Sequence, residues 1–149
     1  MAKWKRTKDP LYRGDVVGGV ALPDPSADPS LVRHILYLDG YGRQTPYLST
    51  TEARATAERF ARPAASRCVY ATSVPDWDRA DVQHISRKEL LQLLRPPGKG
   101  EAKWPSAFEI MQARRRVEEH AEHLASFRAH DRSSEDGLRG LCDSLFKTD

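Results

Sequence analysis

The chain has 149 residues, of which 39% are hydrophobic and 30% are charged, and its formal net charge is +3 at pH 7. This length suits one ordinary domain with a single core, and the composition is typical of soluble globular proteins. No run approaches the roughly 18 apolar residues that a membrane span needs, so we expect a soluble protein without a membrane partner. The 24 basic residues are nearly matched by 21 acidic ones, so bulk charge alone does not indicate a nucleic-acid-binding protein.

The first ten residues, 1–10, are rich in basic side chains, lack apolar periodicity and close on a proline. This pattern predicts a flexible basic arm, followed by an ordered domain over 11–128 and by a linker with a short amphipathic helix over 129–149. No apolar segment follows the arm, so we expect no secretory signal peptide in this chain. We therefore expect a cytoplasmic protein, or one secreted or delivered as part of a larger effector.

The first predicted elements are a short strand and a short helix. Residues 11–17 combine apolar side chains with Arg13 and end at Gly18, which is typical of a short strand. After a proline-rich loop, Ser30 is placed to cap an apolar helix over 31–38.

A second strand is predicted over 46–49, directly before a helix whose apolar positions recur at helical spacing over 53–61. Ser49 would then stand at a strand-to-helix junction. A purely structural interpretation is also open, because Ser49 followed by Glu52 matches the capping-box pattern of a helix N-terminus.

The second half begins with the clearest strand of the chain, over 67–74, and 81–85 predicts another. Ser86 followed by Glu89 is a capping-box pattern for a leucine-rich helix that ends near residue 94.

Ser106 opens the longest predicted helix. Its apolar stripe consists of Ile110, Ala113, Val117, Ala121 and Leu124. After a polar linker over 128–136, the segment 138–146 again forms one apolar helical face, which either packs on the domain or contacts a protein partner. These elements predict a mixed α+β fold with flanking helices and a long C-terminal helix.

Two motifs stand out in chain order: Tyr12-Arg13-Gly14 in the first strand, and Tyr47-Leu48-Ser49-Thr50-Thr51 in the second, with glutamates downstream. This arrangement resembles the arginine, serine-threonine, glutamate pattern of mono-ADP-ribosyltransferases, especially the small bacterial toxin-like members. The resemblance implies a small split-sheet fold, NAD as substrate and no metal. It also implies transfer of ADP-ribose to a protein or nucleic-acid acceptor, with release of nicotinamide.

The residue types suit this chemistry. Breaking the bond between nicotinamide and ribose builds positive charge on the ribose carbon, which a nearby carboxylate stabilises. The planar fork of Arg13 can donate two hydrogen bonds to pyrophosphate oxygens. Ser49 and Thr50 can hold the carboxylate in a fixed rotamer and touch the ribose.

The resemblance leaves the catalytic glutamate open between Glu109 and Glu101, with Glu109 preferred because it falls in the first turn of the long helix beside apolar neighbours. A first-turn carboxylate that stabilises the helix dipole is the alternative for Glu109. Glu118 and Glu119 lie deeper in the same helix. The family usually has a glutamine or glutamate two residues before the catalytic glutamate, and no such pair follows the predicted strands.

Gly14 and aromatic side chains complete the expected NAD site. Tyr12 and Tyr47, together with Tyr41, are candidates to stack on nicotinamide or adenine, with core packing as the alternative. Arg13 has its own structural alternatives, which are solvation on an edge strand or an ion pair with Asp15.

Other features fit weaker interpretations. His120 and His123 lie one helical turn apart, but no third ligand is obvious, so we expect no metal site. Cys68 and Cys142 form no metal or redox spacing, and we expect both to be reduced and structural. Two further hypotheses stay open: a non-catalytic interaction module that uses the 138–146 helix, and a nucleic-acid-binding protein that uses the basic arm with 114–116.

Overall fold

The structure, a computed structural model, describes residues 10–38, 44–60, 67–130 and 135–149. Apart from Pro10, the expected basic arm lies outside the described residues, as does Tyr41. In chain order the elements are β1 (Leu11–Val16), α1 (Leu31–Leu36), β2 (Tyr47–Thr51), α2 (Arg54–Phe60), β3 (Arg67–Thr72), α3 (Val74–Arg79), β4 (Gln83–Ile85), α4 (Arg87–Leu93), the 3-10 helix η2 (Gly100–Ala102), α5 (Ala107–His120), β5 (Glu122–Ser126), α6 (Glu135–Leu145) and β6 (Lys147–Thr148).

The described strands form one six-stranded antiparallel sheet of order β4-β5-β2-β1-β3-β6. β2 pairs with β5, and β1 pairs with β3, along the whole length of each strand. Within the described residues the two halves are joined by the single register pair Tyr12↔Thr51. The expected mixed α+β fold is therefore confirmed, with one six-stranded sheet whose two halves diverge on either side of this pair.

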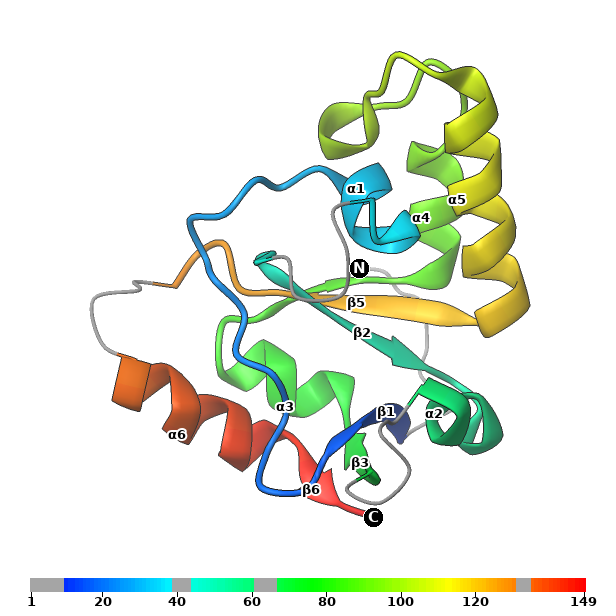
Figure 1. Ribbon diagram of the computed structural model, residues 1–149. Helices are drawn as coiled ribbons and strands as arrows, with labels where there is room; N and C mark the ends of the chain where they lie inside the picture. Colours follow the sequence, from blue (N-terminus) through cyan, green and yellow to red (C-terminus); the bar gives the residue numbers. More distant parts are fainter. Residues whose placement is uncertain (1–9, 39–43, 61–66, 131–134) are drawn as a thin grey trace.

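Helices cover both faces of the β4-β5-β2 half, with α1, α4 and α5 on one side and α3 and α6 on the other (Figure 1). Because successive side chains of a strand point to opposite faces, each strand contributes side chains to the packing on both sides of the sheet. Tyr47 of β2 and Leu124 of β5 pack with α1, α4 and α5, whereas Leu48 and Ala125 pack with α3 and α6. The side chains of Ser49 and Glu122 are two residues from Tyr47 and Leu124 respectively, so they share the first face.

The three helix starts predicted from Ser30, Ser86 and Ser106 are confirmed, since each hydroxyl accepts a main-chain N–H of the first turn. Ser86 and Glu89 form the complete capping box. The prediction did not anticipate α3, which follows directly after β3.

The predicted extent of the longest helix is wrong. α5 has 14 residues and ends at His120, where Ala121 adopts a left-handed backbone with a φ of 48°. The chain then continues as β5 rather than as helix to Leu124. Leu124 is buried in the same cluster as Ile110 of α5, so the apolar spacing continued across a helix-to-strand boundary that the stripe could not reveal.

The C-terminal helix α6 has 11 residues and packs on the domain itself. Leu138, Cys142, Leu145 and Phe146 are buried in one cluster with Trp77 of α3. Both cysteines are free thiols, and burial raises the pKa of Cys142 to about 11. The apolar face that could have contacted a partner is therefore part of the core.

No helix within the described ranges has the length and hydropathy needed to cross a membrane.

Replacing Leu145 by alanine should lower the free energy of unfolding by about 2–5 kcal/mol, because the substitution leaves a cavity in a packed core. Chemical denaturation of the purified protein measures this difference. Ser144→Ala, at an exposed position on the same helix, is the control and should change stability by less than about 0.5 kcal/mol. Equal stability of Leu145→Ala and the wild type would contradict the docking of α6.

Candidate active site

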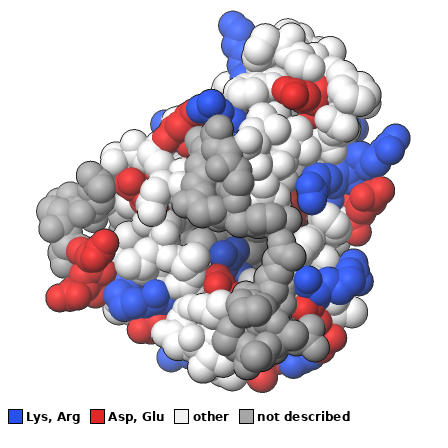
Figure 2. Space-filling model, viewed as in Figure 1, with Lys and Arg blue, Asp and Glu red and all other residues white. Residues whose placement is uncertain are grey.

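A cavity of about 420 Å³ opens where the two halves of the sheet diverge, between β1, β2, the start of β5 and helices α1, α2 and α5. The space-filling view shows a hollow on this side of the molecule, with basic and acidic atoms inside it (Figure 2). The residues that line this cavity include Tyr12, Arg13, Gly14, Asp15, Tyr37, Ser49, Thr50, Arg59, Arg116, His120 and Glu122.

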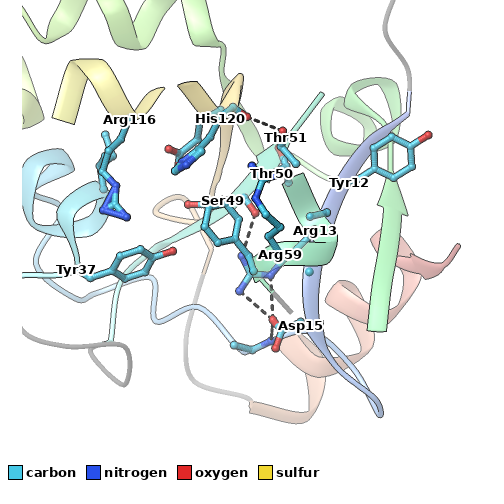
Figure 3. A pocket seen from close by; sticks show the side chains of 16 residues that line it. Tyr12, Arg13, Asp15, Tyr37, Ser49, Thr50, Thr51, Arg59, Arg116 and His120 are labelled. Atoms are coloured by element: carbon cyan, nitrogen blue, oxygen red, sulfur yellow. Dashed lines mark hydrogen bonds and ion pairs between the residues drawn. The ribbon is translucent and has the colours of Figure 1, made fainter. Parts of the chain in front are cut away.

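Arg13 is fixed at the floor of this cavity by two neighbours. Its Nη1 donates to the main-chain carbonyl of Ser49 at 3.0 Å, and its Nε and Nη2 lie 3.0 and 2.9 Å from Asp15 Oδ2. Asp15 in turn accepts the main-chain N–H groups of Val16 and Ala21. The ion pair that the sequence left as an alternative therefore exists, and the same guanidinium also lines the cavity (Figure 3).

Ser49 lies in the middle of β2, because the strand continues to Thr51 and α2 begins only at Arg54. The predicted strand-to-helix junction at Ser49 is therefore wrong. The capping-box alternative also fails, since the Ser49 hydroxyl lies 2.8 Å from His34 Nε2 and the Glu52 carboxylate lies 2.7 Å from His123 Nε2. Ser49 is left facing the cavity with Arg13.

Besides Asp15, which is paired with Arg13, the cavity is lined by the acidic side chain of Glu122, the first residue of β5. Glu122 pairs with Thr51 in the register of β2 and β5, which puts its side chain diagonally across from Ser49. The two side chains share one face of the sheet and one cavity, and hydrogen bonding from Ser49 acts to lower the pKa of the Glu122 carboxyl. Sequence reasoning missed Glu122 because it placed this residue inside the long helix, and the segment 122–127 (Glu-His-Leu-Ala-Ser-Phe) has no clear apolar-polar alternation that would have indicated a strand.

Burial gives Glu122 an unusual protonation behaviour. Desolvation raises its pKa from 4.5 to about 7, against the opposing effects of the Ser49 hydrogen bond and of Arg116 and Arg13. A carboxyl that titrates near neutral pH inside a cavity is a frequent property of functional sites.

The two glutamates preferred from the sequence do not reach the cavity. Glu109 accepts a hydrogen bond of 2.6 Å from Trp104 Nε1, and its main-chain N–H donates to Ser106, as the helix-start alternative anticipated. Glu101 accepts a hydrogen bond of 2.6 Å from Arg128, which lowers the pKa of the carboxyl. Neither side chain is brought together with Arg13 and Ser49.

Of the residues expected to contact NAD, some line the cavity and one lies in the core. Tyr12, Gly14 and Thr50 line the cavity, although the Thr50 hydroxyl donates to the main-chain carbonyl of His123. Tyr47 instead belongs to the core, where its hydroxyl donates to the Pro29 carbonyl and burial raises its pKa to about 12.

Side chains that the sequence analysis did not assign to the NAD site complete the cavity: Arg59 of α2, Arg116 and His120 of α5, and Tyr37 at the end of α1. The Arg116 guanidinium lies 5.7 Å from the centre of the Tyr37 ring, on the side of the cavity opposite Arg13 and Asp15 (Figure 3). Tyr37 has a left-handed backbone with a φ of 54°, which is uncommon for a residue with a side chain. With three guanidinium groups around it, the cavity suits an anionic ligand that has an aromatic part.

His120 and His123 point to different parts of the protein. His120 lines the cavity, and burial followed by the charge of Arg116 lowers its pKa. His123 is fully buried and lies 2.9 Å from His84 as well as close to Glu52. Within the described part of the chain, no three metal-binding side chains form a cluster.

Comparison with protein-family models, with curated proteins and with solved structures finds no match to this chain. The cavity combines an arginine fork fixed on one strand, a hydroxyl on the next and a desolvated carboxyl on a third. Such a set can bind a phosphate-bearing ligand and stabilise positive charge beside the carboxylate.

The raised pKa of Glu122 predicts a pH-dependent stability. The folded state holds the proton more tightly than the unfolded state, so this contribution is complete below about pH 4.5 and is lost as the pH rises to about 7. Relative to Glu122→Gln, which has no titrating group, the wild type should lose roughly 3 kcal/mol of unfolding free energy between pH 4 and pH 8. Urea unfolding of both proteins across this range measures the difference, and parallel curves would contradict a desolvated Glu122.

Proposed function

We propose that this protein transfers ADP-ribose from NAD to a macromolecular acceptor and releases nicotinamide, with water as the acceptor when no other is present. The observation that carries the proposal is the presence of Arg13, Ser49 and Glu122 around one cavity, on three different strands. These residues match the arginine, serine-threonine, glutamate order of the mono-ADP-ribosyltransferases that the sequence resembles, with Glu122 in the role first assigned to Glu109 or Glu101.

Glu122 would stabilise the transition state. As the bond between ribose and nicotinamide breaks, positive charge develops on the ribose, and a carboxylate in a desolvated cavity stabilises it strongly. The pyridinium of NAD is itself a cation, so its arrival favours the ionised form of Glu122. Hydrogen bonding from Ser49 fixes the carboxylate in place.

Binding of the dinucleotide is assigned to the basic and aromatic side chains. Arg13 has Asp15 on one edge of its fork, and Arg59 and Arg116 add further guanidinium groups that can meet the pyrophosphate. The ring of Tyr37, beneath Arg116, offers a stacking surface for adenine or nicotinamide.

The residue two positions before Glu122 bears on how an acceptor is activated. Counting from Glu122, the position where the family usually carries glutamine or glutamate holds His120, which also lines the cavity. Its lowered pKa favours the neutral ring, which can accept a proton from an attacking hydroxyl or amine. An acceptor on a protein or nucleic acid fits this arrangement, as does a role as the toxin or effector domain of a larger protein.

The competing hypothesis of a non-catalytic interaction module used the apolar face of the C-terminal helix. That face is buried against α3 and the sheet. The remaining observations on the cavity therefore favour the enzymatic proposal.

Glu122→Gln should reduce nicotinamide release from NAD by roughly 100-fold to 1,000-fold, because one preorganised charge is removed from the transition state. Release is measured with purified protein and NAD. Glu101→Gln and Glu109→Gln are matched controls outside the cavity and should retain wild-type rates. No release by the wild type, or equal rates in wild type and Glu122→Gln, would refute the proposal.

Arg116→Ala should weaken NAD binding by about 10-fold or more, the effect of losing one charge-assisted contact to a phosphate. Isothermal titration calorimetry with NAD measures the dissociation constant without any acceptor. Arg115→Ala, an exposed neighbour on the same helix that does not line the cavity, serves as the control. If both variants bind NAD equally well, Arg116 is not part of the dinucleotide site.

A further inference from the structure

A chain of polar side chains continues from the cavity into the protein behind Ser49. His34 Nε2 lies 2.8 Å from Ser49 Oγ, and His34 Nδ1 lies 2.9 Å from Thr45 Oγ1. Glu122 lies diagonally beside Ser49 on the same face of the sheet and in the same cavity, where hydrogen bonding from Ser49 acts to lower its pKa, so the series of polar side chains runs Thr45, His34, Ser49, Glu122. His34 is 8% exposed, does not line the cavity and has no part in the proposed chemistry.

The fold holds the His34 ring rigidly. His34 lies on the buried side of α1, whose first turn is capped by Ser30, and its ring packs edge-on against Tyr47 with centres 5.4 Å apart. The main-chain N–H of Tyr47 donates to Thr45 Oγ1, which fixes the far end of the chain. A ring held at both nitrogens has a defined orientation toward Ser49.

The Ser49 hydroxyl has a single proton to donate, which limits the possible directions of the hydrogen bonds along this series of side chains. When Glu122 is ionised it can only accept, so Ser49 must donate to it, and His34 then donates from Nε2 to Ser49 while Thr45 donates to Nδ1. When Glu122 is protonated it can donate to Ser49, and Ser49 then donates to a His34 ring that carries its proton on Nδ1. The protonation of Glu122 and the tautomer of His34 are therefore linked through one hydroxyl.

We propose that His34 is a positioning residue that turns the Ser49 hydroxyl toward Glu122 and thereby holds the ionised carboxylate in place. The effect of His34 on catalysis rests on the proposed function, whereas its effect on the pKa of Glu122 does not. Without an N–H donor behind it, the Ser49 hydroxyl is free to rotate away from the carboxylate, which then loses the hydrogen bond that lowers its pKa.

Other charged and titratable groups also face Glu122 and stay in place when His34 is replaced. They come from every described element around the cavity: Tyr12, Arg13 and Asp15 on β1, Tyr37 at the end of α1, Arg59 on α2, and Arg116 and His120 on α5. These groups are the same in every variant. A change in the pKa of Glu122 between variants therefore measures the effect of His34 that is transmitted through Ser49.

The test is a carbon-13 NMR titration of the Glu122 carboxyl in the protein without NAD, in wild type, His34→Ala and His34→Gln. We expect His34→Ala to raise the pKa of Glu122 by about one pH unit, the effect of one hydrogen bond to a charged group. We expect His34→Gln to restore most of the wild-type value, because a glutamine amide reaches about as far as Nε2 and keeps a donor. His130→Ala, near the far end of β5, is the control.

Nicotinamide release gives a second readout. His34→Ala should lower kcat by about 10-fold, with little change in KM, and should move the pH profile to higher pH. His34→Gln should recover most of this loss.

An unchanged pKa of Glu122 in His34→Ala, or a glutamine variant no closer to wild type than the alanine variant, would overturn the proposal. If His34→Ala does not fold, Thr45→Val provides the test, since it removes the partner of Nδ1 and should raise the same pKa by a smaller amount; no change there would also overturn it. If the wild type releases no nicotinamide, the proposed function fails, and the carboxyl titration still decides the role of His34.

Discussion

The site depends on how Arg13 joins the two halves of the split sheet. β2 is paired with β5 along its length, but among the described residues it is paired with β1 at Thr51 alone, so no strand of that part of the chain pairs with Ser49 on the side of β1. The Arg13 guanidinium instead donates to the Ser49 carbonyl at 3.0 Å and is itself anchored by Asp15. A side chain thus replaces a main-chain N–H, and the space between the diverging strands becomes a cavity rather than continuous sheet.

Register and alternation then decide which side chains enter this cavity. Because β2 and β5 are antiparallel and Thr51 faces Glu122, Ser49 and Glu122 lie diagonally on one face. That face is apolar farther along, where Tyr47 and Leu124 pack under α1 and α5. The carboxyl therefore lies at the border between a dry core and a basic cavity, which explains both its raised pKa and the way Arg13 and Arg116 oppose the rise.

The polar residues around the carboxyl form a connected system and not a set of separate contacts. Arg13 binds the main chain of Ser49, the hydroxyl of the same residue meets Glu122, and His34 lies behind that hydroxyl. Buried polar groups of this kind are costly unless each has a partner, so the loss of one member disturbs the others. This coupling fits a site in which a carboxylate must stay fixed while charge develops beside it.

The sequence by itself determined the mixed fold, the first strand with Arg13, the second strand with Ser49, and the helix starts at Ser30, Ser86 and Ser106, because strand alternation and helix capping are local properties of the chain. Only the tertiary structure decided which glutamate joins them. Ala121 ends α5 in a left-handed conformation, and Leu124 continues the apolar spacing of the helix although it lies in a strand. The spacing of apolar residues indicates that their side chains face the same core, but it does not indicate whether a helix or a strand carries them. The pairing of β5 with β2 is a contact between segments far apart in the chain, and it alone placed Glu122 beside Ser49 and left Glu101 and Glu109 outside.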